Sequence, residues 1–230
     1  LHKGETLAIV GESGCGKTVS SKAIMRLLPE SNTIIGENSE VLFHGEDLLK
    51  KSENEMVSIR GSKISMIFQD PMSYLNPIVT IEKQMTEGIR FHTKCSKKEA
   101  VQRAVELMKM VGIPAPESRL KQYPFEFSGG MRQRIIIAIA LACNPKLIVA
   151  DEPTTALDVT VQAQILDLLK DITRESNAGV IIITHDLGVV ASLCDRISIM
   201  YGGNIMEEGT TDEIFYLSLI HISEPTRLRC

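Results

Sequence analysis

An eight-residue segment near the start of the chain restricts the possible folds more than any other part of the sequence. It reads Gly11-Glu12-Ser13-Gly14-Cys15-Gly16-Lys17-Thr18 and matches the pattern GxxxxGK[ST] in full. The apolar residues 6–10 before it predict a buried strand, and residues 17–28 after it predict a helix that Pro29 ends. Glycines let such a loop turn its N–H groups toward phosphate oxygens at the positive end of the helix. The segment therefore predicts a phosphate-binding loop rather than a plain strand-to-helix turn.

Two acidic residues later in the chain are candidates for the metal ligand and the general base that a nucleotide-hydrolysing site needs besides the phosphate loop. An apolar strand at residues 147–150 delivers Asp151 and Glu152 to its carboxyl end, where α/β sheets bind their ligands. In the phosphate loop, Lys17 can reach the β and γ phosphates and the Thr18 hydroxyl can bind Mg²⁺. We expect Asp151 to bind the same Mg²⁺ and Glu152 to act as the general base toward the attacking water. Up to this point the residues predict an ATPase or a GTPase, without deciding between them.

The remaining pattern predicts the fold class, an α/β P-loop (RecA-like) core with a parallel sheet. Further strands are expected at 64–69, 180–184 and 197–201, helices at 159–175 and 187–193, and a small antiparallel hairpin within 34–49. Between the strands, residues 81–92, 97–111 and 130–143 look helical, and Ser96 with Glu99 forms a capping box. The predicted domains are the core at 1–71 and 146–216 and an inserted helical subdomain at 72–145.

Composition excludes several classes of protein. Apolar residues make up 43% of the 230 residues, as in ordinary globular proteins, and the net charge of -4 argues against nucleic-acid binding. No apolar run approaches the roughly 18 residues of a membrane-spanning helix, and the longest covers only residues 135–143. The five cysteines are scattered without a CxxC pair, which favours a reduced, cytosolic protein. Work at a membrane would need another chain to do the spanning.

A second glycine-containing element decides between the remaining classes. Ser128, Gly129 and Gly130 precede the helix predicted at 130–143. Ser128 is a suitable N-cap, and the bare glycines at a helix N-terminus form another surface that can bind phosphate. One chain does not need two such surfaces for one nucleotide. Two chains arranged head to tail do, with each covering the γ-phosphate of the other.

With this element the chain resembles the ATPase subunits of ABC transporters, over residues 1–216. The resemblance implies that Gln69 senses Mg²⁺ and the attacking water. It implies that Asp158 belongs to a loop along the dimer seam and that His185 contacts the γ-phosphate. It also implies binding of ATP with Mg²⁺ in a composite site. The residues of that site are Gly11, Ser13, Gly14, Cys15, Gly16, Lys17, Thr18, Gln69, Asp151, Glu152, Asp158 and His185, with Ser128, Gly129 and Gly130 from the partner.

The amino-acid sequences of three segments resemble those of the oligopeptide and dipeptide importer branch, which also includes nickel carriers. These segments are residues 68–77, 127–134 and 151–164. This resemblance implies an ATP-hydrolysing subunit that drives uptake of peptides or related small solutes from the cytoplasmic face of the membrane. The implied partners are a second ABC ATPase, identical or different, transmembrane permease subunits and, indirectly, a solute-binding protein. The alternatives are a soluble ABC ATPase without a transport role and an inactive fragment.

Three departures from the family pattern add expectations. The ten residues before Gly11 include no aromatic side chain to stack on adenine, and we expect the native N-terminus to lie further upstream. Cys15 stands where the family has a small residue, and a thiol beside a helix N-terminus is expected to be readily alkylated unless ATP protects it. Residues 217–230 do not resemble the family, and we expect this tail to be non-native.

Overall fold

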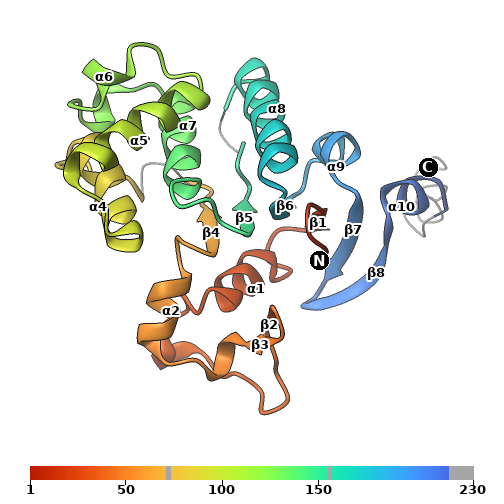
Figure 1. Cartoon of the computed structure of the whole chain (residues 1–230). Helices are drawn as coiled ribbons and strands as arrows, with labels where there is room; N and C mark the ends of the chain where they lie inside the picture. The colour runs from red at the N-terminus through yellow and green to blue at the C-terminus, as the bar shows by residue number, and fades with distance from the viewer. Residues whose placement is uncertain (71–73, 155–156, 218–230) are drawn as a thin grey trace.

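The structure, a computed structural model, describes residues 1–70, 74–154 and 157–217, and a sheet of six strands lies at its centre (Figure 1). The strand order is β4-β5-β6-β1-β7-β8, in which the first five strands are parallel and β8 is antiparallel to β7. The strands are β1 (Thr6–Gly11), β4 (Ile64–Ile67), β5 (Leu147–Asp151), β6 (Gly179–Thr184), β7 (Arg196–Tyr201) and β8 (Asn204–Thr210). Because β4, β5, β6 and β1 are parallel neighbours, their carboxyl ends meet at one edge.

Alternating side chains of these strands divide the core between the two faces of the sheet. On β5, Ile148 and Ala150 belong to one buried cluster and Leu147 and Val149 to the other. The first cluster continues into α7 (Gly129–Ala140), α8 (Val159–Ser176) and α9 (Leu187–Leu193). The second continues into the end of α1 (Lys17–Ile24) and into α2 (Glu53–Ile59). Side chains of a strand point alternately to opposite faces, so both faces of this sheet are covered by helices.

The helices between β4 and β5 in the chain form a group at one end of the molecule (Figure 1). They are α4 (Ile81–Thr93), α5 (Lys97–Met110), α6 (Pro116–Arg119) and α7. The 3-10 helices are Glu30–Asn32, Leu48–Lys50 and Pro124–Glu126, and α10 (Thr211–Leu217) follows β8. A separate two-stranded sheet pairs β2 (Leu42–Phe43) with β3 (Glu46–Asp47). Within the described parts of the chain, no helix is long and apolar enough to cross a bilayer.

The predicted elements are present, with differences at their ends. The capping box of α5 is confirmed, and the helix predicted to reach residue 28 ends at Ile24. It ends early because Arg26 takes a left-handed conformation, φ 51°, and reverses the chain. The sequence reading missed α2, α6, β8 and α10. Of these, α2 carries a local signal, since Ser52 and Glu55 form a complete capping box.

Candidate functional site

The phosphate loop connects β1 to α1 and is shaped by glycines in left-handed conformations. Gly14 has φ 82° and Gly16 has φ 109°, and no side chain caps the N-terminus of α1. A Cβ at Gly11 would lie 2.1 Å from the carbonyl oxygen of Met200, so this position accepts glycine only. The exposed Ser13 lies within the same loop. The uncapped N–H groups at the start of α1 therefore remain available to an anion.

The ammonium group of Lys17 lies inside the loop. Its Nζ donates to the carbonyl oxygens of Gly11 and Glu12, both at 2.8 Å, and the residue is 6% exposed. The Sγ of Cys15 is 3.7 Å from the same nitrogen, and Cys15 is 7% exposed. The expectation of a readily alkylated thiol at Cys15 does not agree with this burial, because reagents reach a sulfur only through solvent.

The first residue pair that the sequence reading assigned to Mg²⁺ is in direct contact. The Thr18 hydroxyl donates to Oδ1 of Asp151 at 3.0 Å, which joins the start of α1 to the end of β5. Asp151 is 2% exposed. Burial raises the pKa of the Asp151 carboxyl, and the charge of Glu152 adds to this effect, whereas the Thr18 hydrogen bond opposes it. The site therefore holds a buried oxygen ligand next to a hydroxyl, a donor set suited to a hard cation.

Glu152 lies between two other predicted residues. Gln69, which follows β4, donates from Nε2 to Oε2 of Glu152 at 2.7 Å. On the other side, Nδ1 of His185, after β6, is 3.2 Å from Oε1 of Glu152. The backbone at Glu152 is left-handed, φ 45°, and its N–H donates to the carbonyl of Ile183 at 2.9 Å. The ends of β4, β5 and β6 thus converge on one carboxylate.

Residues 128–130 lie at the N-terminus of α7 and contact α7 and α8 of their own chain. Ser128 caps α7, its hydroxyl accepting from the Met131 N–H at 3.4 Å. Gly130 packs so closely on α8 that a Cβ there would lie 2.6 Å from Cγ1 of Val161, while one at Gly129 would be 4.0 Å from its nearest neighbour. Asp158 caps α8, with Oδ1 accepting from the Val161 N–H at 2.9 Å. No side-chain hydrogen bond within the described residues joins Ser128 or Asp158 to the phosphate loop.

Two supports of the site were missed by the sequence reading. The turn between β7 and β8 lies against the phosphate loop, with the Gly203 N–H donating to the Cys15 carbonyl at 2.9 Å. The adjacent glycines Gly202 and Gly203 are the signal that would have located this turn. The ring of Phe68, next to Gln69, stacks on Tyr74 with centroids 3.5 Å apart. No local pattern in the sequence predicts the contact between Phe68 and Tyr74.

The family model for the ABC transporter matches residues 1–155. The oligopeptide transport ATP-binding protein OppD of Bacillus subtilis is 60% identical over 216 residues, which cover 94% of this chain and 60% of that protein. The dipeptide transport ATP-binding protein DppD of the same organism is 56% identical and is covered to 64%. The chain thus spans less than two thirds of the length of these curated relatives.

A solved structure agrees with the family match. The ATP-binding cassette MJ0796, in a dimeric post-hydrolysis state bound to ADP and Pi, superimposes with a TM-score of 0.79 at 31% identity. The match covers 92% of this chain and 87% of that one. Its α/β P-loop fold is the fold predicted from the sequence.

Proposed function

The chain belongs to the ABC transporter family, and on that premise we propose that it is the ATP-hydrolysing subunit of an importer of peptides or related small solutes. The observation that carries the proposal is the convergence at one sheet edge. Four neighbouring strands, β4, β5, β6 and β1, end at Gln69, at Asp151 and Glu152, at His185 and at the phosphate loop. A chain that only bound nucleotide would not need a carboxylate held between a glutamine and a histidine.

In this proposal the phosphate loop binds ATP. The N–H groups at the start of α1 donate hydrogen bonds to phosphate oxygens. Lys17, which in the structure donates to loop carbonyls, turns its ammonium group to the β and γ phosphates. Thr18 and Asp151 would hold Mg²⁺, with Gln69 nearby, and the ion would neutralise charge that develops on the phosphates. In this role Asp151 would be ionised, against the effect of burial, which raises the pKa of its carboxyl.

Glu152 is proposed as the general base. Its two carboxylate oxygens contact Gln69 and His185, so the group is oriented before any substrate arrives. A carboxylate held in this way can accept a proton from water. Gln69 would orient that water, and His185 would contact the γ-phosphate. His185 has a side chain 68% exposed, which leaves it accessible to a ligand at the edge.

The Ser128, Gly129 and Gly130 segment is proposed to complete the site of a second copy or of a related ATPase chain. In its own chain it packs against the start of α8, and Asp158 lies at the same place. The dimeric state named for the MJ0796 cassette supports pairing with a second cassette, and the head-to-tail arrangement is part of the proposal. We further propose the domain division at 1–71 with 146–216 and at 72–145. The proposed location is peripheral, on the cytoplasmic face of the membrane next to permease subunits.

Thermal melts with and without MgATP test the proposal. A ligand that binds only the folded state raises the melting temperature. We expect a rise for the parent chain, none for Lys17→Ala, and a retained rise without hydrolysis for Glu152→Gln. An equal MgATP-induced rise in melting temperature for the parent and Lys17→Ala would refute the assignment of the phosphate loop. A Glu152→Gln protein that hydrolyses ATP at the parental rate, with the partner chain present, would refute the assignment of the base.

A further inference from the structure

The helix that follows the phosphate loop ends in a short reversal, after which the carbonyl groups of Met25 and Arg26 face donors outside the helix. Arg26 is left-handed, and the Leu27 N–H donates to the Lys22 carbonyl at 2.9 Å. The Arg26 N–H donates to the Ala23 carbonyl, also at 2.9 Å. This pattern satisfies the carbonyls one turn earlier. The carbonyls of Met25 and Arg26 lie past the last helical bond and are open to donors outside the helix.

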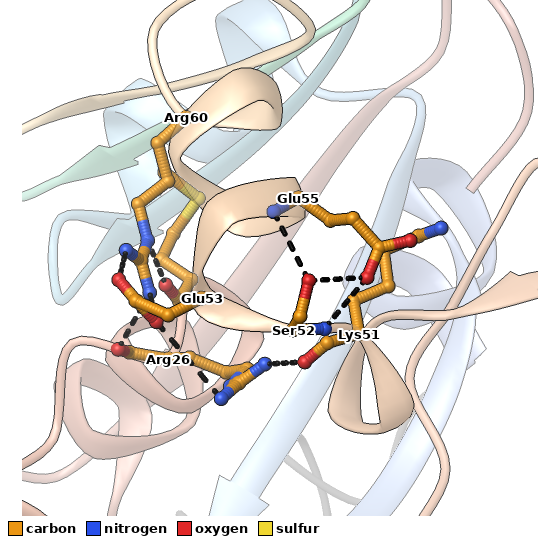
Figure 2. Close-up of polar contacts among 7 residues, drawn as sticks. Arg26, Lys51, Ser52, Glu53, Glu55 and Arg60 are labelled. Atoms are coloured by element: carbon orange, nitrogen blue, oxygen red, sulfur yellow. Dashed lines mark hydrogen bonds and ion pairs between the residues drawn. The ribbon is translucent and has the colours of Figure 1, made fainter.

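Arg60, which immediately follows α2, supplies both donors (Figure 2). Its Nε donates to the Met25 carbonyl at 2.8 Å, and one terminal nitrogen donates to the Arg26 carbonyl at 3.0 Å. The side chain is 19% exposed. A planar guanidinium presents several donors in a fixed geometry, and its positive charge lies at the negative end of the helix. Arg60 therefore closes α1 at the end opposite the phosphate loop.

Glu53, in the first turn of α2, orients Arg60 (Figure 2). Both of its carboxylate oxygens contact the Arg60 guanidinium, the longer contact being 3.4 Å. The guanidinium of Arg26 is 3.9 Å from the same carboxylate and also donates to the carbonyl of Lys51. The capping box of Ser52 and Glu55 fixes the start of α2. The Arg60 guanidinium thus contacts the carbonyls at the end of α1 on one side and the Glu53 carboxylate of α2 on the other.

We propose that Arg60 is a positioning residue for nucleotide binding, an inference that rests on the proposed function. With only eight residues, α1 is about 12 Å long, so a shift at its last turn reaches Lys17 and Thr18 at its first. The turn that carries Arg60 also touches the helical group: a Cβ at Gly61 would lie 3.2 Å from Nε2 of His92 on α4. Arg60 therefore lies where the ends of α1 and α2 come close to α4.

The first test needs no nucleotide. Hydrogen exchange of the α1 amides, followed by mass spectrometry, is compared in the parent, Arg60→Gln, and Arg103→Gln. Arg103 is the matched control, since it also bridges an acid on its own helix, Glu106, and a neighbouring segment at Asn144, but on α5. We expect faster exchange across α1 in Arg60→Gln only. Parental exchange in Arg60→Gln would overturn the proposal.

The second test measures the Kd of MgATP at a temperature at which every variant is fully folded. For Arg60→Gln we expect Kd to rise about fivefold, equivalent to roughly 1 kcal/mol. Arg60→Lys should be intermediate, because one ammonium cannot serve both carbonyls and Glu53 together. A role confined to stability leaves Kd unchanged in folded protein, and that result, or an equal rise in Arg103→Gln, would refute positioning. Failure of the parent itself to bind MgATP refutes the proposed function instead, while the exchange experiment still decides the role of Arg60.

Discussion

Replacing Gly130 by alanine should destabilise the folded chain even in the absence of nucleotide and partner. The added Cβ would lie 2.6 Å from Cγ1 of Val161, 3.6 Å from Cγ2 and 3.7 Å from Cβ. Valine on a helix is largely restricted to one rotamer, so rotation of its side chain does not clear the clash. The start of α7 and the start of α8 must therefore move apart.

The magnitude follows from two opposing contributions. Overpacking a close contact costs about 1–3 kcal/mol, and this contact is well inside van der Waals distance. Alanine in place of glycine within a helix returns at most about 1 kcal/mol, and less in the first turn. The expected net loss is about 1.5 kcal/mol, which corresponds to a fall in Tm of about 3–6 °C for a chain of this size.

Thermal or urea unfolding of four variants measures the effect and locates it. Gly129→Ala is the matched control, because its Cβ would meet nothing closer than 4.0 Å. Its free energy of unfolding should lie within about 0.5 kcal/mol of that of the parent. In a Val161→Ala background, Gly130→Ala should be nearly neutral, so the double-mutant cycle should report a coupling of about 1.5 kcal/mol.

Two results would refute this reasoning. One is a Gly130→Ala protein that is as stable as Gly129→Ala. The other is a loss of stability that persists unchanged in the Val161→Ala background, which would mean that the cost does not come from this contact. Either way, the melt separates the packing role of Gly130 from its proposed contact with the nucleotide of a second chain, since that contact is absent from the isolated protein.

Two further predictions follow from buried ionisable groups. Asp151→Asn should raise the Tm measured without nucleotide at pH 7 and abolish the Mg²⁺ dependence of the ATP-induced shift. The pKa of the Asp151 carboxyl is raised in the folded state, so the contribution of Asp151 to stability falls as pH rises from the unfolded-state pKa through the folded-state pKa. The gain in Tm from Asp151→Asn should accordingly shrink in melts at acid pH. Burial raises the pKa of the Cys194 thiol to about 12, so peptide mapping after alkylation at pH 8 should find Cys194 unmodified in native protein and modified after unfolding. Modification of native Cys194 at the rate of the half-buried Cys95 would contradict this.

Local signals account for most of what could be predicted. The strand, glycine loop and helix at β1 and α1, the acid pair after β5 and the capping box of α5 each depend on residues close together in the chain. In contrast, β8 is an edge strand whose residues are mostly exposed, so it lacks the apolar run that marked the other strands. The left-handed Arg26 that shortens α1 is stabilised by Arg60, which lies 34 residues further along the chain.

The same distinction applies within the candidate site. Parallel strands bring Gln69, Glu152 and His185 to one edge, and this much follows from their positions after apolar runs. Their mutual contacts depend on strand register. The Glu152 N–H reaches the Ile183 carbonyl because Asp151 pairs with Ile183, and that pairing involves two segments with no shared local pattern. The left-handed backbone at Glu152 was for the same reason not predictable.

The backbone at Glu152 offers a way to separate the demands of the site from those of the fold. At φ 45° a residue with a Cβ is strained by about 1–2 kcal/mol, which glycine relieves at a conformational-entropy cost of about 0.5–1 kcal/mol. Glu152→Gly and Glu152→Ala both remove the contacts to Gln69 and His185, so their difference isolates the backbone. We expect Glu152→Gly to unfold at a Tm about 1–3 °C above that of Glu152→Ala, with hydrolysis absent in both. Equal melting would show that the backbone is unstrained there. The expected difference would show that a residue with a Cβ is strained at this position, a cost that Glu152 bears while its carboxylate lies between Gln69 and His185.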